Sequence, residues 1–197
     1  MRRIWLGLLI AGVAASAGAL PPGSMAPEFK GVDSNGVAHS LSEYRGKFVV
    51  LEWANRGCPF DQKHYLSGSM EALQKQWTAK GVVWLSVISS APGQQGYVTP
   101  AEENGYLQKM KASPTAVLLD PKGTIGHLYD ARTTPHMFVI DPAGKIVYQG
   151  AIDDKPTTDQ ADLKGADNYL NDALNAAMVG KPVGVAVTRP YGCSVKY

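Results

Sequence analysis

The sequence lacks the signatures of several large classes of protein. It has no internal repeat and no long low-complexity run, and no segment after its first twenty residues is long and apolar enough to span a bilayer. No nicotinamide, flavin or phosphate-binding fingerprint appears, so no organic cofactor is expected. Charged residues make up only 18% of the 197 residues and hydrophobic residues 45%, which is typical of one globular domain with a sizeable core.

The sequence also lacks a net charge when residues 1–19 are left out. The chain has 19 basic and 17 acidic residues, and two of the basic ones, Arg2 and Arg3, lie at the extreme N-terminus. Residues 20–197 are therefore balanced, with as many basic as acidic side chains. This balance gives no reason to expect a nucleic-acid partner or binding to an anionic membrane.

The N-terminal segment, residues 1–19, is predicted to be a cleaved signal peptide. Arg2 and Arg3 form a basic n-region, residues 4–15 an apolar h-region, and ASA or AGA a small-residue cleavage site. A membrane anchor is the alternative, but the apolar run is short for a span of about 20 residues. The sequence therefore predicts a periplasmic or secreted protein, in an oxidising compartment where disulfides persist.

Apolar runs and turn residues divide the rest of the chain into alternating strands and helices. An Asn35-Gly36 turn predicts a hairpin near the start, and a short helix or turn follows it. Buried strands are predicted over 48–54, 82–90, 115–120, 137–141 and 145–150, and helices after Cys58, from Thr99, around 126–132 and over 169–180. This order indicates a three-layer α/β domain with a mixed sheet over 20–182, and a tail, 183–197, packed on it.

The segment after Cys58 has the spacing of an amphipathic helix. Its apolar residues recur at i, i+4, i+7 and i+11, which predicts one continuous helix ending at Gly81. The residues on the predicted buried face are Leu66, Met70, Leu73 and Trp77.

Cys58 stands where chemistry is favoured, because Pro59 suits the first position of a helix and makes Cys58 its N-cap. We expect the sulfur to face the free N–H groups of Phe60 and Asp61, which would stabilise a thiolate. The Asp61 carboxylate would oppose that effect. From these residues alone, Cys58 is either a reactive thiol or an inert buried thiol or disulfide half.

Several motifs together resemble one family. They are WAN (53–55), CPFDQKHY (58–65), TTPHMFVID (133–141), GKIVYQGAIDD (144–154) and GCSVKY (192–197). Over residues 24–197 the chain resembles the thioredoxin superfamily, and within it the peroxiredoxin-like branch of the redoxin (alkyl hydroperoxide reductase C and thiol-specific antioxidant) domain family. The resemblance implies a thioredoxin-like three-layer fold, with an N-terminal β-hairpin extension and an extended C-terminal tail.

The resemblance also implies a site. Cys58 would be the nucleophile, and Pro135 a cis-proline facing it, which leaves the Thr134 backbone free to pair with an extended partner. Pro59, Phe60 and His136 would lie beside that partner.

The chain departs from the family pattern on both sides of Cys58. Asp61 stands where thioredoxins have a second cysteine, so the local dithiol is missing. Asn55 stands where peroxiredoxins have a threonine, and its amide would stabilise the nucleophile or a peroxide. Arg132 or Arg56 would supply the positive charge that peroxiredoxins place beside the thiolate.

Cys193 offers a second thiol, 135 residues after Cys58. It would resolve an oxidised Cys58, form a permanent staple with it, or never meet it. Asp153 and Asp154 follow a strand and are predicted to cap a turn.

Two functions follow. The first is an exported thiol oxidoreductase, with Cys58 attacking a peroxide or a disulfide and a peroxide or thiol compound as partner. The second is a non-catalytic protein that binds a partner, or a metal near His136 and His64, with both cysteines structural. The first is preferred, and it requires no metal.

Overall fold

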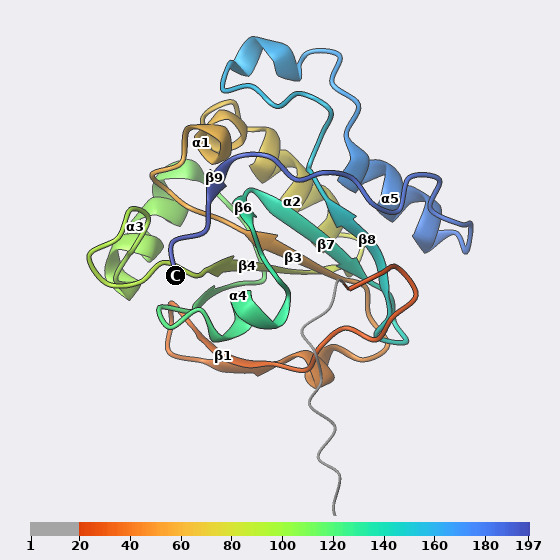
Figure 1. Cartoon of the computed structure of the whole chain (residues 1–197), viewed down its shortest axis with the longest axis horizontal. Helices are drawn as coiled ribbons and strands as arrows, with labels where there is room; N and C mark the ends of the chain where they lie inside the picture. Colours follow the sequence, from red (N-terminus) through yellow and green to blue (C-terminus); the bar gives the residue numbers. More distant parts are fainter. Residues whose placement is uncertain (1–19) are drawn as a thin grey trace, which may run out of the picture.

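A computed structural model describes residues 20–197, and the predicted signal peptide, residues 1–19, lies outside the described residues. The fold is built on a seven-stranded sheet with the order β2-β1-β5-β4-β3-β7-β8 (Figure 1). Its strands are β1 (Lys30–Asp33), β2 (Ala38–Ser40), β3 (Val49–Trp53), β4 (Val83–Ile88), β5 (Ala116–Leu119), β7 (His136–Ile140) and β8 (Ile146–Gly150). Two further strands, β6 (Thr133–Thr134) and β9 (Cys193–Ser194), form a separate ladder.

The sheet is mixed, as the sequence predicts. β3, β4 and β5 are parallel, whereas β7, β8 and the β1–β2 hairpin run antiparallel to their neighbours. β3 and β4 are buried along their whole length, because helices cover both faces and their apolar runs need burial on both sides. The predicted N-terminal hairpin is confirmed, and it extends the sheet by pairing with β5.

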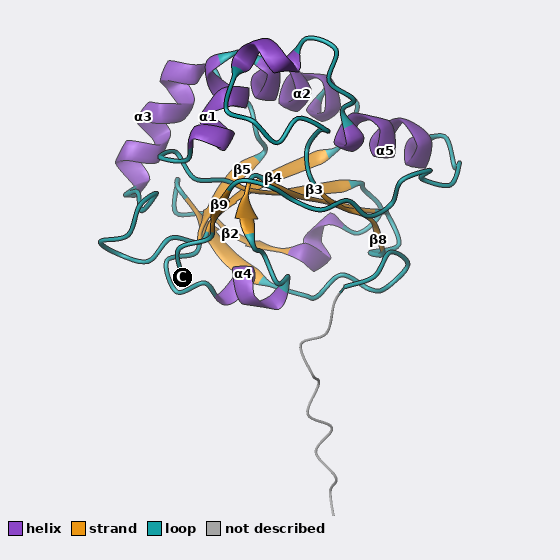
Figure 2. Cartoon of the chain, turned by 45° about the horizontal axis from the view of Figure 1, so that its top comes forward, coloured by secondary structure: helices purple, strands orange, loops and turns teal. Residues whose placement is uncertain are grey.

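Helices lie on both sides of the sheet, which gives three layers (Figure 2). One face carries α1 (Pro59–Leu66), α2 (Ser69–Thr78), α3 (Pro100–Met110) and α5 (Tyr169–Met178), and the other carries α4 (Thr124–Leu128). Short 3-10 helices lie at Leu41–Tyr44 and Gln160–Leu163. Each face has its own apolar core, one around Trp53 and Phe138 and one around Trp77 and Trp84.

The prediction of one continuous helix after Cys58 is wrong. α1 ends at Leu66, and α2 begins after Gly68, which adopts a left-handed conformation with φ of 79°. Glycine takes this conformation without steric cost, so the chain turns there. Leu66 is consequently 58% exposed, while Met70 and Trp77 are buried on α2. The apolar spacing continued by chance across the break.

The C-terminal segment, residues 183–197, crosses the molecule as an extended chain from α5 to the Cys58 end (Figure 1). Val187 pairs with Gln149 of β8, β9 pairs with β6, and the Ala91 N–H donates to the Lys196 carbonyl at 2.8 Å. Within residues 20–197, no helix has the length and apolarity that a bilayer crossing requires. Of the predicted tail, 183–197, we use the name tail below for residues 186–197 only.

Candidate active site

Cys58 is placed by the turn that follows β3. It is the N-cap of α1, with φ of −85° and ψ of 122°, and Pro59 occupies the first helical position as predicted. The Gln62 N–H donates to the Cys58 carbonyl and closes the first turn. The Cys58 side chain is fully buried.

The Cys58 sulfur does not cap the helix, so the expectation that it faces the N–H groups of Phe60 and Asp61 is wrong. The thiol instead donates to the Thr134 carbonyl, 3.1 Å away. A protonated thiol is a donor and therefore turns to an acceptor, which a helix N-terminus does not offer. The Thr134–Pro135 peptide bond is cis.

Cys193 lies beside Cys58. In the β6–β9 ladder it is the register partner of Thr134, the residue whose carbonyl accepts the Cys58 thiol. Both cysteines are free thiols. Burial, together with a hydrogen bond to Cys58, raises the pKa of the Cys193 thiol to about 12. The structure therefore places Cys193 next to Cys58, and the raised pKa favours the protonated form of its thiol.

Asn55 organises the loop before α1. Its side-chain oxygen accepts the Gly57 N–H at 2.8 Å, and its amide nitrogen donates to the Gln95 carbonyl at 3.3 Å. Gly96 packs so closely that a Cβ there would lie 2.3 Å from the Asn55 amide. Both ends of the amide are thus used within the loop, and its role toward a peroxide stays a prediction.

The two arginines proposed for the thiolate have partners elsewhere. Arg56 is buried and donates to both carboxylate oxygens of Glu103, at 2.7 and 3.1 Å. Its guanidinium lies between the rings of Tyr65 and Tyr106, 4.6 and 4.7 Å from their centroids.

Arg132 points to the surface instead. Its side chain is 69% exposed and pairs with Asp130. The structure therefore places neither guanidinium in a contact with the Cys58 sulfur among the hydrogen bonds and ion pairs of residues 20–197.

Asp61 lies in the first turn of α1 and is completely buried. One carboxyl oxygen accepts the Asn55 N–H at 2.9 Å. Burial raises the pKa of this carboxyl to about 8, even though Arg56 lies 3.8 Å away and acts in the opposite direction. This direction favours the protonated carboxyl, which carries no charge to oppose a Cys58 thiolate.

The remaining predicted residues surround the same end of the sheet. His136 is buried, and its Nδ1 accepts the Arg132 N–H at 3.3 Å. Burial lowers the pKa of His136 to about 4, so the ring is neutral. Phe60 meets the ring of Tyr191 edge-on, with centroids 6.0 Å apart. Within residues 20–197 no group of three histidine, cysteine or acidic side chains is arranged to hold a metal ion.

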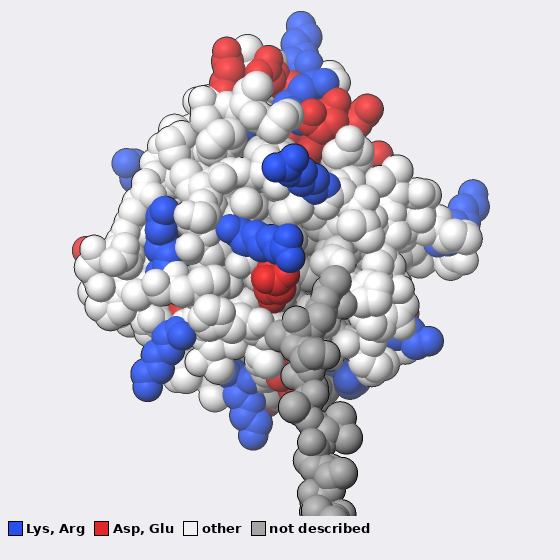
Figure 3. Space-filling model, viewed as in Figure 1, with Lys and Arg blue, Asp and Glu red and all other residues white. Residues whose placement is uncertain are grey.

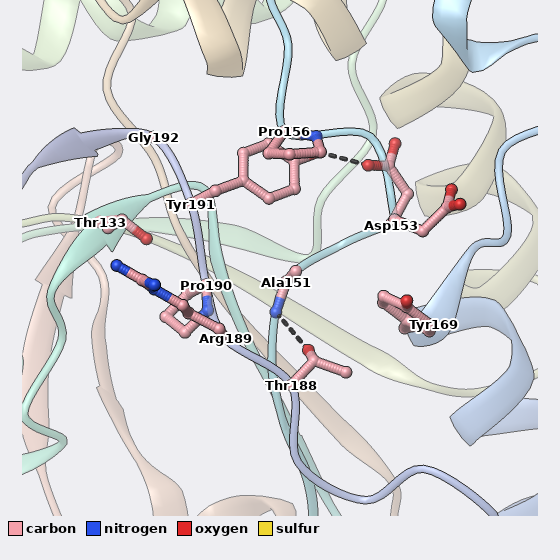
Figure 4. Close-up of a pocket in the computed structure, with 11 residues that line it drawn as sticks. Thr133, Ala151, Asp153, Pro156, Tyr169, Thr188, Arg189, Pro190, Tyr191 and Gly192 are labelled. Carbon is pink, nitrogen blue, oxygen red and sulfur yellow. Dashed lines mark hydrogen bonds between the residues drawn. The ribbon is translucent and has the colours of Figure 1, made fainter.

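A polar cluster around Tyr191 was missed by the sequence analysis. The Tyr191 hydroxyl donates to Asp153, as Figure 4 shows, and Lys63 donates to the Lys155 carbonyl at 2.6 Å and to the Tyr191 oxygen at 3.3 Å. Asp153 also accepts the Lys155 N–H, which confirms the predicted turn cap. In the sequence, the only indication of this cluster was the position of Tyr191, two residues before Cys193.

A cavity of about 620 Å³ opens beside this cluster. It lies between the tail and the segment after β8, and Figure 4 shows its lining residues. They include Thr133 of β6, Asp153, Tyr169 of α5, Arg189 and Tyr191. Acidic side chains gather at the top of the face in Figure 3, over the segment between β8 and α5, with basic side chains among them, whereas the charged side chains over the region of the tail are mainly basic. The tail thus forms one wall of an open pocket close to the two cysteines.

Solved structures resemble this fold along most of its length. An uncharacterised conserved protein from Geobacillus kaustophilus is 24% identical with a TM-score of 0.75, and the match covers 90% of this chain and 93% of that one. The thioredoxin domain of a thiol-disulfide oxidoreductase from Bacteroides vulgatus is 23% identical with a TM-score of 0.52, covering 66% and 89%.

The exposed lipoprotein thioredoxin of Streptococcus pneumoniae strain TIGR4 is 25% identical with a TM-score of 0.50, covering 62% and 87%. No curated protein matches the chain. The AhpC/TSA family model matches residues 22–149, which is more than half of the chain. The chain therefore belongs to the AhpC/TSA family of redoxins and has the thioredoxin fold.

Proposed function

We propose that this protein is a thiol oxidoreductase in which Cys58 is the nucleophile and Cys193 resolves the intermediate. The observation that carries the proposal is the register of β9, because pairing Cys193 with Thr134 holds the second thiol against Cys58. Asp61 occupies the position of the second cysteine of thioredoxins, and Cys193 of the tail would take the role of that cysteine. Two proteins with similar structures, a thiol-disulfide oxidoreductase and a thioredoxin, support the same chemistry.

The reaction begins with the Cys58 thiolate attacking one sulfur of a partner disulfide. A Cys58–partner disulfide forms, and the other partner sulfur leaves as a thiolate. The Cys193 sulfur, after losing its proton, attacks the Cys58 sulfur and expels the second partner thiolate. The partner gains two electrons and two protons, and the protein is left with a Cys58–Cys193 disulfide. The reverse sequence oxidises a dithiol.

Disulfide exchange fits the surroundings of Cys58 better than peroxide reduction does. A peroxide site needs donors and positive charge aimed at the reacting oxygens. Here the Asn55 amide is engaged with Gly57 and Gln95, and the Arg56 charge is matched by Glu103. An extended edge with a free cysteine opposite Thr134 is, in contrast, suited to a peptide substrate.

Peroxide reduction is the second candidate, and membership of the AhpC/TSA family favours it. The Cys58 thiolate would attack the peroxide, releasing an alcohol or water and leaving a sulfenic acid. Cys193 would then displace water from that sulfur and form the same disulfide. Both candidates use the same two sulfurs and differ in the oxidant.

A non-catalytic protein with a permanent staple is the contrasting alternative. A Cys58–Cys193 disulfide would close a loop of more than 100 residues, worth about 4–5 kcal/mol in the chain-entropy model. The staple would persist in mild reductant, whereas a redox disulfide would open and close.

We place this reaction outside the cytoplasm, in the periplasm or the secreted medium. The support is the signal-like sequence of residues 1–19 and the exposed lipoprotein among the similar structures. The partner is a peroxide or a thiol compound, and the proposal includes neither a nucleic acid nor a membrane.

The test is a trapping experiment with Cys193→Ser. Reduced wild type and variant are mixed with glutathione disulfide or, separately, with dilute hydrogen peroxide, and the products are identified by intact mass. The variant should accumulate Cys58–glutathione in the first arm, while wild type proceeds to an intramolecular disulfide. Cys58→Ser/Cys193→Ser is the matched control and should trap nothing. A response confined to the peroxide arm would favour the second candidate, and no response in either would contradict both.

A further inference from the structure

Gly192 of the tail packs directly against Thr134, beside the two cysteines. Gly192 has φ of 131°, a conformation that side-chain-bearing residues rarely adopt. A Cβ at Gly192 would lie 2.0 Å from the Thr134 carbonyl oxygen, the acceptor of the Cys58 thiol. The residue before Cys193 must therefore be glycine for the tail to approach this edge.

Tyr191 fixes the tail on one side of that glycine. Its hydroxyl donates to Asp153, and the Lys63 ammonium lies 5.2 Å from its ring centroid. Phe60, the residue after Pro59, packs edge-on against the same ring. The aromatic residue two positions before the cysteine is thus recognised by its ring and by its hydroxyl.

Tyr197 fixes the tail on the other side. Its ring stacks on His127 with centroids 3.9 Å apart, and its hydroxyl donates to the Ala131 carbonyl at 2.7 Å. A Cβ at Gly123 or Gly126 would lie 2.3 or 2.4 Å from that ring. Two glycines of the body therefore leave the space that an aromatic residue four positions after the cysteine fills.

The docked tail leaves Cys58 without access to solvent. The Cys58 side chain is fully buried, and the edge of β6 that a partner would pair with is taken by β9. A large thiol partner cannot reach Cys58 in this arrangement, so the tail must lift before exchange begins.

We propose that the tail occupies the binding site of an external extended chain, and that this chain replaces it with its own cysteine in the place of Cys193. The proposal rests on the function proposed above and names its substrate class. The partner is a protein segment with an aromatic residue and a glycine directly before its cysteine, and an aromatic residue four positions after it. β6 supplies the main-chain pairing, and the sites of Tyr191 and Tyr197 supply the specificity.

The tail then has two successive roles in one cycle. It leaves when the partner binds, and Cys58 forms a disulfide with the partner cysteine while the second partner sulfur leaves as a thiolate. It returns when Cys193 attacks the Cys58 sulfur, and the partner departs as a thiolate that takes up a proton. Return of the tail therefore both completes the electron transfer and displaces the reduced product.

The test uses the full-length protein and a reaction that needs no redox partner. Cys58 alkylation by iodoacetamide is followed in Cys193→Ser, and compared with Cys193→Ser/Gly192→Ala. The alanine prevents close docking, so the Cys58 rate should rise about tenfold or more. Gly184→Ala in the same background is the matched control, because its Cβ would meet nothing within 4 Å. Cys193→Ser/Tyr197→Ala, which removes the far anchor, should raise the rate by a smaller factor.

A synthetic peptide then tests the site itself. It has the sequence of residues 186–197 with serine for the cysteine, and it is added to Cys193→Ser/Gly192→Ala. Protection of Cys58 from alkylation, lost when alanine replaces the glycine of the peptide, supports the proposal. No protection at millimolar peptide overturns it, as does an unchanged alkylation rate in both docking variants with far-UV circular dichroism intact.

The oligomeric state gives an independent outcome. Light scattering of the wild type should give a monomer, since the tail docks on its own chain. A dimer with exchanged tails would overturn the assignment of the site to an outside partner. Failure of the proposed function would look different, because Cys58 would be protected by the peptide and yet form no disulfide with glutathione.

Discussion

Two buried polar clusters flank helix α1, and they differ in which part of the chain covers them. In the first, Arg56 meets both Asp61 and Glu103 of α3, and all three side chains are at most 6% exposed. In the second, Lys63 meets Asp153 and Tyr191, which belongs to the tail. The first is enclosed by the domain itself, whereas one wall of the second is a segment held on the surface.

The comparison separates the cluster that stabilises the fold from the cluster that controls access to Cys58. Charges buried inside a domain must stay paired for the fold to persist. A cluster closed by an extended segment can open when that segment lifts, at the cost of a few contacts. We call the first the fixed cluster and the second the removable cluster; both include side chains of α1, whose N-cap is Cys58.

The largest expected effect comes from breaking the fixed cluster. Glu103→Gln removes the charge that pairs with Arg56 and leaves a buried guanidinium without its main partner. We expect a loss of about 3–5 kcal/mol in the free energy of unfolding. Asp172→Asn, at an exposed carboxylate of α5, is the control and should change stability by less than about 0.5 kcal/mol. Urea denaturation measures both, and equal losses would contradict the distinction.

The pH dependence of stability should show the protonated Asp61. Its pKa is raised to about 8, so the folded state holds a proton that the unfolded state releases, and stability falls as pH rises from about 4 to 8. His64 and His136, with pKa values lowered to about 3 and 4, make stability rise with pH up to about 6.5. Above that pH the two histidines no longer contribute, and the Asp61 effect remains.

Asp61→Asn tests this sign. The wild type should lose about 1–2 kcal/mol between pH 6.5 and 8, a figure set by the limit of about 1.4 kcal/mol per pH unit for one proton. In the variant this slope should disappear. Thermal or urea unfolding at several pH values gives the slopes directly. A wild-type stability that is flat or rising over this window would show that Asp61 is ionised.

The smallest effect on stability should come from the removable cluster. Tyr191→Phe deletes the hydrogen bond to Asp153 and the longer one from Lys63, and should cost about 1 kcal/mol of global stability, or less if only the tail loosens. Hydrogen exchange should nevertheless increase clearly at the amides that join the tail to the body. One of them is the Val195 N–H of the tail, which donates to the Arg132 carbonyl. Tyr97→Phe, at a half-exposed tyrosine outside the cluster, is the control. A global loss as large as that of Glu103→Gln would mean that the tail is part of the core.

The fold was predictable because its signals are local. Continuous apolar runs gave β3 and β4, the Asn35-Gly36 turn gave the β1–β2 hairpin, and Pro59 gave the start of α1. The break at Gly68 was missed because the apolar spacing of α1 continues into α2. A glycine within an apolar pattern is only a weak signal of a break.

The site was predictable only in part. Cys58 and its place at the N-cap follow from the residues around it, but the direction of its sulfur depends on Thr134, 76 residues away. The proximity of Cys193 and the clusters of Lys63 and Glu103 depend on long-range packing, which periodicity does not encode. The raised pKa of Asp61 follows from burial, and no neighbouring residue in the sequence indicates it.

The central claim is that Cys58 and Cys193 form a reversible pair, and disulfide mapping tests it most directly. The reduced wild type is oxidised with a small excess of glutathione disulfide, blocked with iodoacetamide, digested and analysed by mass spectrometry, before and after a brief treatment with dithiothreitol. The account predicts a Cys58–Cys193 disulfide that forms on oxidation and opens in reductant. Two cysteines that remain alkylated after oxidation, or a Cys58–Cys193 bond that resists the reductant in the folded protein, would contradict it.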